Sequence, residues 1–255
     1  FVPTPVAASP WNPDVLHGGA PAGLLSYLLE QNGPADKQLC RVVIDLLRPV
    51  PRRPLQARTS VVRDGGRLSL RSVELWHADK LVARATGTWV KPMPVALPDY
   101  APQSERLLPL PPYIDVTDFS CIFSKKDIVI PPGLHTYMQI KPITPPLEQG
   151  SGRWWMRVPM ALVEGEMLTP MARVGVISDF CNGVGQLNLG GNVGMINADI
   201  SLQLHRIPQG EWIGLDGVAR VQPNGIGATQ CRLFDENGEV GYVMQTVMPQ
   251  AEFAG

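Results

Sequence analysis

The chain has 255 residues, of which 44% are hydrophobic and 18% charged, a composition typical of a globular protein with a sizeable core. Its formal net charge of -1 argues against a broad electrostatic surface for nucleic acid or for an anionic membrane. The 26 prolines are about twice the usual share, and they disfavour long helical bundles because a proline inside a helix costs about 3 kcal/mol.

The cysteines and apolar runs bear on the cellular compartment. The four cysteines, Cys40, Cys121, Cys181 and Cys231, form no CxxC pair, so we expect a reduced protein of the cytoplasm. No apolar run is long enough for a membrane span, and no secretory signal is apparent. The start at Phe1 suggests that the true N-terminus lies upstream.

The first part of the chain predicts one helix followed by a β-meander. Residues 18–29 carry leucines at helical spacing, and Gly33 is a typical stop signal. The segments that follow are rich in β-branched residues, and Asp64-Gly65-Gly66 is a typical hairpin turn. The predicted strands are 41–47, 55–63, 67–76 and 80–90.

Prolines then crowd one stretch of the chain. Seven of them lie between Pro92 and Pro112, where they disfavour both a helix and an inner strand. We therefore predict an N-terminal unit at 1–92, an extended linker at 93–114 and a C-terminal unit at 115–255. A second proline cluster, within 131–146, predicts a loop or an edge segment.

The C-terminal unit repeats the layout of the first. Thr169-Pro170 is typical of a helix start, with threonine as the N-cap and proline in the first turn. A strand is predicted before this helix and four after it, and the ranges are 152–158, 197–204, 211–221, 227–234 and 240–247.

Two short segments of one unit match the other unit. Leu46–Pro49 falls opposite Leu204–Pro208, and Asp79–Ala83 falls opposite Gly238–Tyr242, at an offset near 159 residues. This indicates an internal duplication, with chance similarity between two meanders as the alternative. The predicted fold class is α+β, with the two sheets side by side and a helix laid against each.

Common catalytic motifs are missing from the sequence. It has neither a G-x-S-x-G nucleophile elbow nor a G-x-x-x-x-G-K-[ST] phosphate loop. The four histidines share no short metal spacing, and we predict no metal site and no cofactor. His77 and His135 are predicted to lie in turns or loops without a functional role.

His17-Gly18-Gly19 directly precedes the predicted first helix. The N–H groups of a first helical turn point outward and can receive an anion or a polarised carbonyl oxygen, while the glycines let a ligand approach the backbone. The alternative is that the glycines serve only a tight turn.

Taken together, these segments resemble the double-hotdog acyl-CoA thioesterase II-like family over nearly the whole chain. In the first unit the resemblance rests on the His17-Gly18-Gly19 helix entry, on Asp45–Val50 and on Val62–Arg67. In the second it rests on motifs at Ser178–Phe180, Asn197–Arg206, Asp235–Gly238 and Met244-Gln245. The resemblance implies a double hotdog that hydrolyses a fatty acyl-CoA and forms a homodimer or a higher homo-oligomer.

The resemblance also implies a catalytic set. In the family an Asp on the second hotdog helix, a hydroxyl residue opening the next strand and a Gln in the last strand position a water, and these fall on Asp179, Asn197 and Gln245. Asp179 would be the general base, and the amides would orient the water. The N–H groups of Gly18 and Gly19, beside His17, would meet the oxyanion.

Each of these residues also has a structural alternative. Asp179 would then be a surface carboxylate, Gln245 a solvent-facing strand residue and Asn197 the start of a strand. Asn197 replaces the family's usual Thr, and Ala20 replaces its usual Gln. The rival function is therefore a non-catalytic hotdog that binds acyl-CoA or CoA. A hydratase is disfavoured, because its Asp-x4-His spacing is missed here.

Overall fold

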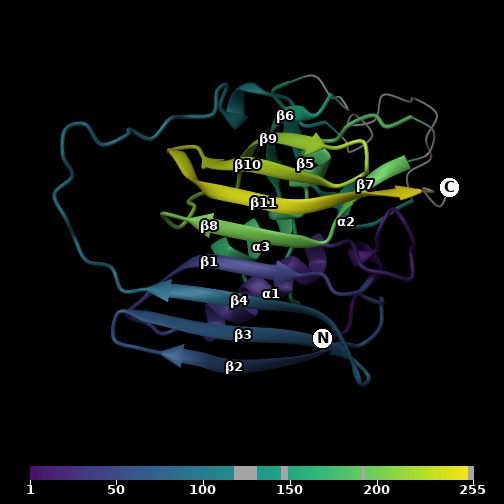
Figure 1. Ribbon diagram of the computed structural model, residues 1–255, viewed down its shortest axis with the longest axis horizontal. Coiled ribbons are helices and arrows are strands. Elements are labelled where there is room, and N and C mark those ends of the chain that lie inside the picture. Colours follow the sequence, from purple (N-terminus) through teal and green to yellow (C-terminus); the bar gives the residue numbers. More distant parts are fainter. Residues whose placement is uncertain (118–130, 145–148, 191–192, 252–255) are drawn as a thin grey trace.

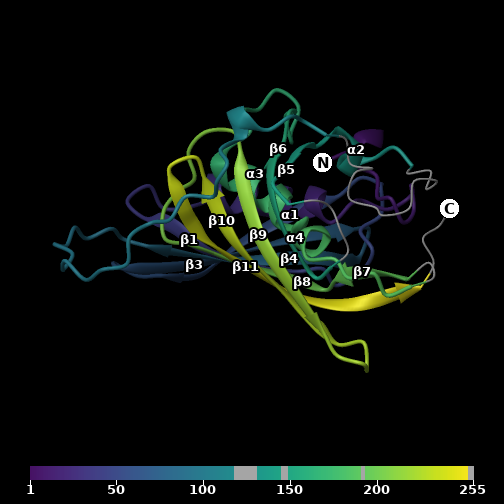
Figure 2. The same ribbon diagram turned by 90° about the horizontal axis from the view of Figure 1, so that it is seen from above.

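One continuous antiparallel sheet dominates the molecule (Figure 1). The computed structural model describes residues 1–117, 131–144, 149–190 and 193–251. Ten strands follow the order β2-β3-β4-β1-β8-β11-β10-β9-β6-β5, and an eleventh, β7, pairs with β11. Figure 2 shows the helices lying on one face of this sheet.

The N-terminal unit follows the predicted layout. A 3-10 helix at Pro5–Ala7 precedes the long helix α1, and the four predicted strands form at nearly the expected positions. The elements are α1 at Gly19–Gln31, β1 at Gln38–Asp45, β2 at Gln56–Asp64, β3 at Leu68–His77 and β4 at Lys80–Val90.

The C-terminal unit contains the predicted helix and strands, with additions. The predicted elements are β6 at Ser151–Arg157, α3 at Pro170–Ser178, β8 at Asp199–Leu204, β9 at Ile213–Val221, β10 at Gly227–Asp235 and β11 at Gly238–Ala251. The sequence did not predict α2 (Leu134–Tyr137), α4 (Cys181–Val184) or β7 (Val193–Asn197). The edge segment expected within 131–146 contains the edge strand β5 (Gln139–Pro142).

The two units share the sheet through β1 and β8, which pair antiparallel from Arg41↔Gln203 to Asp45↔Asp199. The side chains of Val42, Ile44, Ile200 and Leu202 are fully buried along this junction. The double hotdog is therefore built with its sheets side by side, as the resemblance implies.

The helices α1 and α3 also pack against each other. A Cβ added at Gly175 would lie 2.5 Å from Ser26 Oγ and 2.8 Å from the carbonyl oxygen of Ala22. Such a contact is possible only because glycine has no side chain. The N-cap of α3 is Thr169, whose Oγ1 accepts a hydrogen bond from Ala172 N–H at 3.3 Å, and Pro170 occupies the first turn.

The proline-rich stretch between the units runs along the outside of the molecule (Figure 1). Its residues from Lys91 to Tyr100 are exposed. Further on, Leu107 is buried against Trp155 and Phe234, and Trp155 Nε1 donates to the carbonyl oxygen of Pro109 at 2.9 Å. The boundaries 1–92, 93–114 and 115–255 stay a prediction.

Other sequence expectations concern cysteines and membrane spans. The three cysteines that the structure describes, Cys40, Cys181 and Cys231, are free, and Cys121 lies outside the described residues. No helix in the described part of the chain has both the length and the apolar character needed to cross a membrane.

Candidate active site

A cavity of about 600 Å³ lies between the two units. The start of α1, the end of α3, the segment after β1 and the strands β7 and β11 contribute to its wall. Its size is within the range of small-molecule sites. Four of the predicted site residues, His17, Gly18, Asp179 and Asn197, line this cavity, whereas Gly19 and Gln245 do not.

Asp179 is the carboxylate at the centre of this group. It directly follows the last residue of α3, and only 7% of it is exposed. Asn197 Nδ2 donates to Asp179 Oδ1 at 2.9 Å, and His17 Nδ1 lies 3.0 Å from Asp179 Oδ2. Asn197 of the C-terminal unit thus holds one carboxylate oxygen, and His17 of the N-terminal unit contacts the other. The alternative that Asp179 is a surface carboxylate is therefore wrong.

Gly18 makes room for this carboxylate. A Cβ at Gly18 would lie 2.5 Å from Asp179 Oδ1 and 2.8 Å from Oδ2, closer than any real Cβ contact. Among the described residues, no partner is recorded for the N–H of Gly18, which stands at the helix entry where such groups point outward. Because Gly18 has no side chain, it leaves space for the Asp179 carboxylate, and its N–H is a hydrogen-bond donor beside that carboxylate.

His17 is held between two rings. Its imidazole stacks on Phe180, with ring centroids 4.6 Å apart, and on His135, at 5.8 Å. Its Nδ1 is also 3.1 Å from the N–H of buried Gly19. An unprotonated Nδ1 would accept from Gly19, whereas a protonated Nδ1 would donate to Asp179, so this nitrogen can serve either neighbour but not both at once.

His135 departs from its sequence prediction. It lies in the short helix α2 and is fully buried, and its Nε2 is 2.9 Å from the carbonyl oxygen of Pro131. Burial, followed by the proximity of His17, lowers the pKa of His135 to about 4, so this ring is neutral at pH 7. The prediction that His135 lies in a turn or loop is wrong, because it lies in α2, which packs beside the entry of α1 and brings its ring against His17. The absence of a functional role for His135 stays a prediction.

Asn197 is the last residue of β7. The predicted strand 197–204 is divided at Ala198, and β8 begins at Asp199. The backbone N–H of Ala198 donates to Thr246, and its carbonyl oxygen accepts from Leu46. This break places the Asn197 amide at the cavity wall, within reach of Asp179.

Gln245 faces the helices from β11, where alternate residues Val243, Gln245 and Val247 are buried. Its Nε2 donates to the carbonyl oxygen of Ser178 at 3.0 Å and lies 3.5 Å from that of Asp179. Its Oε1 is buried and has no hydrogen-bond partner among the described residues. A solvent-facing role for Gln245 is therefore wrong, and its amide binds the backbone that carries Asp179.

Sequence reasoning missed three neighbours of the site: Phe180 and His135, which stack on His17, and Arg48, which lines the cavity from the segment after β1. Phe180 directly follows Asp179, so its place beside the carboxylate was readable from the chain order, but its stacking on His17 was not. Within the described part of the chain, no group of three His, Cys, Asp or Glu side chains is arranged to hold a metal ion.

Solved structures similar to this chain have the same fold. An acyl-CoA thioesterase II from Mycobacterium marinum has a TM-score of 0.66 and 17% identity, with 94% of this chain and 91% of that chain covered. A thioesterase from Novosphingobium aromaticivorans has a TM-score of 0.68 and 17% identity, covering 92% and 87%. A hotdog-fold protein from Alicyclobacillus acidocaldarius has a TM-score of 0.70 and 12% identity, covering 95% and 90%.

Sequence comparison points to one family. A search of curated proteins finds no match. The family model of the acyl-CoA thioesterase N-terminal domain matches residues 7–90, and that of the C-terminal domain matches residues 111–248. Each model covers one of the two helix-and-sheet units described above. The chain therefore belongs to the acyl-CoA thioesterase family.

Proposed function

We propose that this acyl-CoA thioesterase cleaves its substrate with a water molecule that Asp179 activates as general base. The observation that carries the proposal is the Asp179 carboxylate, nearly buried at a cavity wall and held at 2.9 Å by Asn197 and at 3.0 Å by His17. A fixed carboxylate beside a substrate-sized cavity supplies both orientation and proton transfer.

The reaction would proceed by direct attack of this water on the thioester carbonyl. Asp179 takes a proton from the water, and the oxygen of the water bonds to the carbonyl carbon. The oxyanion that forms meets the N–H of Gly18, and one such donor is typically worth about 3 kcal/mol. Collapse of the intermediate breaks the carbon–sulfur bond, and the departing sulfur receives the proton from Asp179, giving a carboxylic acid and free CoA.

His17 positions Asp179 and responds to its charge. When the carboxylate is ionised, a proton on His17 Nδ1 stabilises it, since two lone pairs 3.0 Å apart would repel each other. When Asp179 has taken the proton, Nδ1 can instead accept from Gly19 N–H. His17 would therefore act through the carboxylate.

Asn197 and Gln245 would hold the reacting groups in place. Asn197 Nδ2 fixes one carboxylate oxygen, and its amide lies on the cavity wall, where it can also orient the water. Gln245 binds the carbonyl oxygens at the end of α3, and its Oε1 remains as a buried acceptor. Both would contribute proximity rather than proton transfer.

We further propose that the acyl part of the substrate is a fatty acyl chain and that the protein works as a homodimer or a higher homo-oligomer in the cytoplasm. The largely apolar wall of the cavity suits an acyl chain. The edge strand β2 exposes Val61 and Val62, a surface that a second copy would cover. The free thiols of the described cysteines agree with a reducing compartment.

The test is the Asp179→Asn variant. We expect kcat for a panel of acyl-CoAs, measured by thiol release, to fall at least a hundredfold, because an amide cannot take the proton. The melting temperature should change little, since the amide keeps the shape of the side chain.

The matched control is Asp199→Asn, which alters a nearby carboxylate that is not part of the cavity wall and binds Thr246 N–H. Full activity is expected there, because the amide oxygen can still accept that bond. Unchanged turnover in Asp179→Asn would remove Asp179 from the mechanism. Tight binding of acyl-CoA by the wild type without any hydrolysis would favour the non-catalytic binding protein.

A further inference from the structure

The internal repeat aligns two arginines in the sequence, although the backbone of their segments is offset by one residue, since Arg48 N–H and His205 N–H donate to the equivalent residues Val82 and Val240. Arg48 follows β1 and Arg206 follows β8, each in a Leu-x-Arg segment. Because β1 and β8 pair antiparallel at the centre of the sheet, the two segments leave this pair at opposite ends. If both arginines only supported the fold, they should have equivalent partners.

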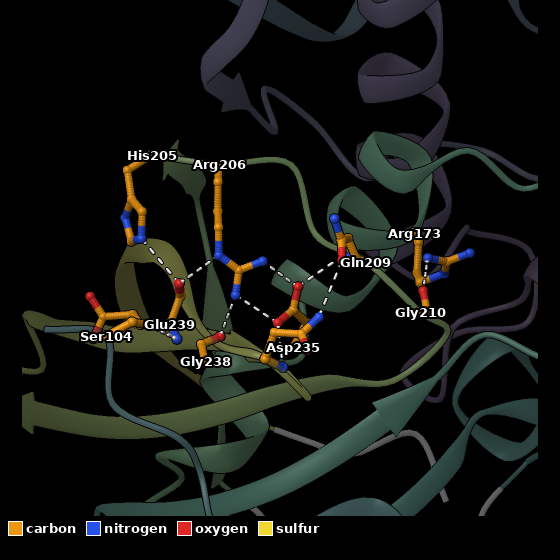
Figure 3. A network of polar contacts seen from close by, with 10 residues as sticks. Ser104, Arg173, His205, Arg206, Gln209, Gly210, Asp235, Gly238 and Glu239 are labelled. Atoms are coloured by element: carbon orange, nitrogen blue, oxygen red, sulfur yellow. Dashed lines mark hydrogen bonds and ion pairs between the residues drawn. The ribbon is translucent and has the colours of Figure 1, made fainter. Parts of the chain in front are cut away.

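The guanidinium of Arg206 binds three residues of its own unit, Asp235, Gly238 and Glu239 (Figure 3). Its guanidinium binds Asp235 with two nitrogens, one of them 2.6 Å from Asp235 Oδ1, and donates to the carbonyl oxygens of Gly238 and Glu239 at 2.9 and 3.2 Å. Burial alone would raise the pKa of the fully buried Asp235, but the hydrogen bonds from Arg206, Gln209 and Asn237 outweigh it and lower this pKa. Arg206 therefore braces the turn between β10 and β11.

The first unit lacks the partner for such a brace. Asp235 ends β10 and pairs with Gly238 across the turn, and the equivalent residue, His77, ends β3 and pairs with Lys80. His77 Nδ1 lies 3.1 Å from the carbonyl oxygen of Pro54. A histidine thus stands where the second unit has the carboxylate, so Arg48 has no equivalent ion pair.

Arg48 instead belongs to the wall of the active-site cavity. Its backbone N–H donates to Val82 at 3.2 Å, which fixes the segment, while the side chain is exposed. Neither an ion pair nor a hydrogen bond of its guanidinium is recorded within the described residues. Among the described residues that line the cavity, Arg48 is the one lysine or arginine.

Arg48 and Asp179 line the same cavity but differ in their exposure to solvent. Asp179 is nearly buried, where a thioester can be shielded from bulk water, whereas Arg48 is exposed at the same cavity. A phosphate is too costly to bury without a counter-charge, and an exposed guanidinium binds it with two parallel hydrogen bonds. Every acyl-CoA carries such phosphates, whatever its acyl chain.

We propose that Arg48 binds a phosphate group of the CoA part of the substrate, an inference that rests on the proposed thioesterase function of the same cavity. The first copy of the repeat thus uses for ligand binding the arginine that the second copy uses to brace a turn. The ligand chemistry is a phosphate, either the 3'-phosphate or the pyrophosphate.

Binding of CoA, 3'-dephospho-CoA and pantetheine to the wild type and to Arg48→Gln tests this by calorimetry. We expect the variant to bind CoA roughly ten- to a hundredfold more weakly, as for other charge-assisted bidentate contacts. If the 3'-phosphate is the ligand, this difference disappears with dephospho-CoA. If the pyrophosphate is the ligand, the difference in affinity between the two proteins persists with dephospho-CoA and disappears with pantetheine.

If the wild type and Arg48→Gln bind CoA equally well, the assignment of Arg48 is overturned. It is also overturned if the variant loses as much affinity for pantetheine, which has no phosphate, as for CoA. The matched control is Arg53→Gln, since Arg53 is an exposed arginine of the same loop that does not line the cavity. An equal loss of CoA affinity in Arg53→Gln would show a general effect of the positive charge of the loop, and it would also overturn the proposal. Hydrolysis of acyl-CoA by the wild type, measured in parallel, separates these results from a failure of the proposed function.

Discussion

At the scale of single residues, the site depends on the absence of one side chain. Asp179 and Gly18 come from different units, and the carboxylate occupies the space where a Cβ of residue 18 would be. The hydrogen bond from Asn197 and the contact with His17 then fix the carboxylate in that space. The glycine is thus as much a part of the geometry as the residues that carry charge.

The Gly18→Ala variant tests this dependence. The added methyl would push the carboxylate away from its two partners, and we expect kcat to fall by about a hundredfold, the size of effect that a displacement of about 1 Å can produce. Gly66→Ala is the matched control, since a Cβ there meets nothing within 4 Å. An alanine variant at position 18 that keeps full kcat would show that the carboxylate has room to move.

The resemblance of the sequence to a family predicted Asp179, Asn197, Gln245 and the helix entry at His17, and the structure brings most of them to one cavity. His135 could not be predicted in the same way. It is 118 positions from His17 in the chain, and its place at the site depends on how α2 packs, which no local pattern encodes. The partners of Gln245 likewise depend on where α3 ends relative to β11.

At the scale of elements, the crossing of α1 and α3 sets the position of both sides of the site. The leucine spacing of α1 and the start signal of α3 were visible in the sequence, but the contact between residues about 150 positions apart was not. Short elements such as β7 and α4 were also missed, because four or five residues carry too little pattern to distinguish them from a loop.

Gly175→Ala should disturb this crossing. A Cβ there would meet the backbone carbonyl of Ala22 at 2.8 Å, so the helices must separate, and we expect a loss of about 1–3 kcal/mol in the free energy of unfolding. Chemical denaturation measures this loss. Gly183→Ala, in α4, should not destabilise the fold, since its Cβ meets nothing within 4 Å. Equal stability of Gly175→Ala and the wild type would contradict the close packing of the helices.

At the scale of the whole molecule, the buried β1–β8 junction joins the halves in addition to the linker. The proline excess predicted an extended connection, and the exposed residues 91–100 agree with that view. Composition could not show that the two sheets become one, because strand pairing between units is decided by burial along the junction.

A protease site inserted between Val95 and Leu97, both strongly exposed, should therefore be cut without loss of structure. We expect the two fragments to elute together in size-exclusion chromatography and to retain thioesterase activity, because the buried strands of the junction and the α1–α3 contact remain. The uncut protein carrying the same insertion is the control. Fragments that separate in native buffer would show that the covalent connection, rather than the sheet, holds the units together.

The two copies of the repeat in one chain also have a consequence for how such a site can evolve. In a symmetric dimer of identical chains, a substitution appears in both subunits, so one arginine position must satisfy both surroundings at once. In a fused duplicate each position can be changed separately. His77 and Asp235 differ at one such pair of positions, and Arg48 and Arg206 accordingly lie in different surroundings. Two copies of the unit in one chain can therefore take different roles at corresponding positions.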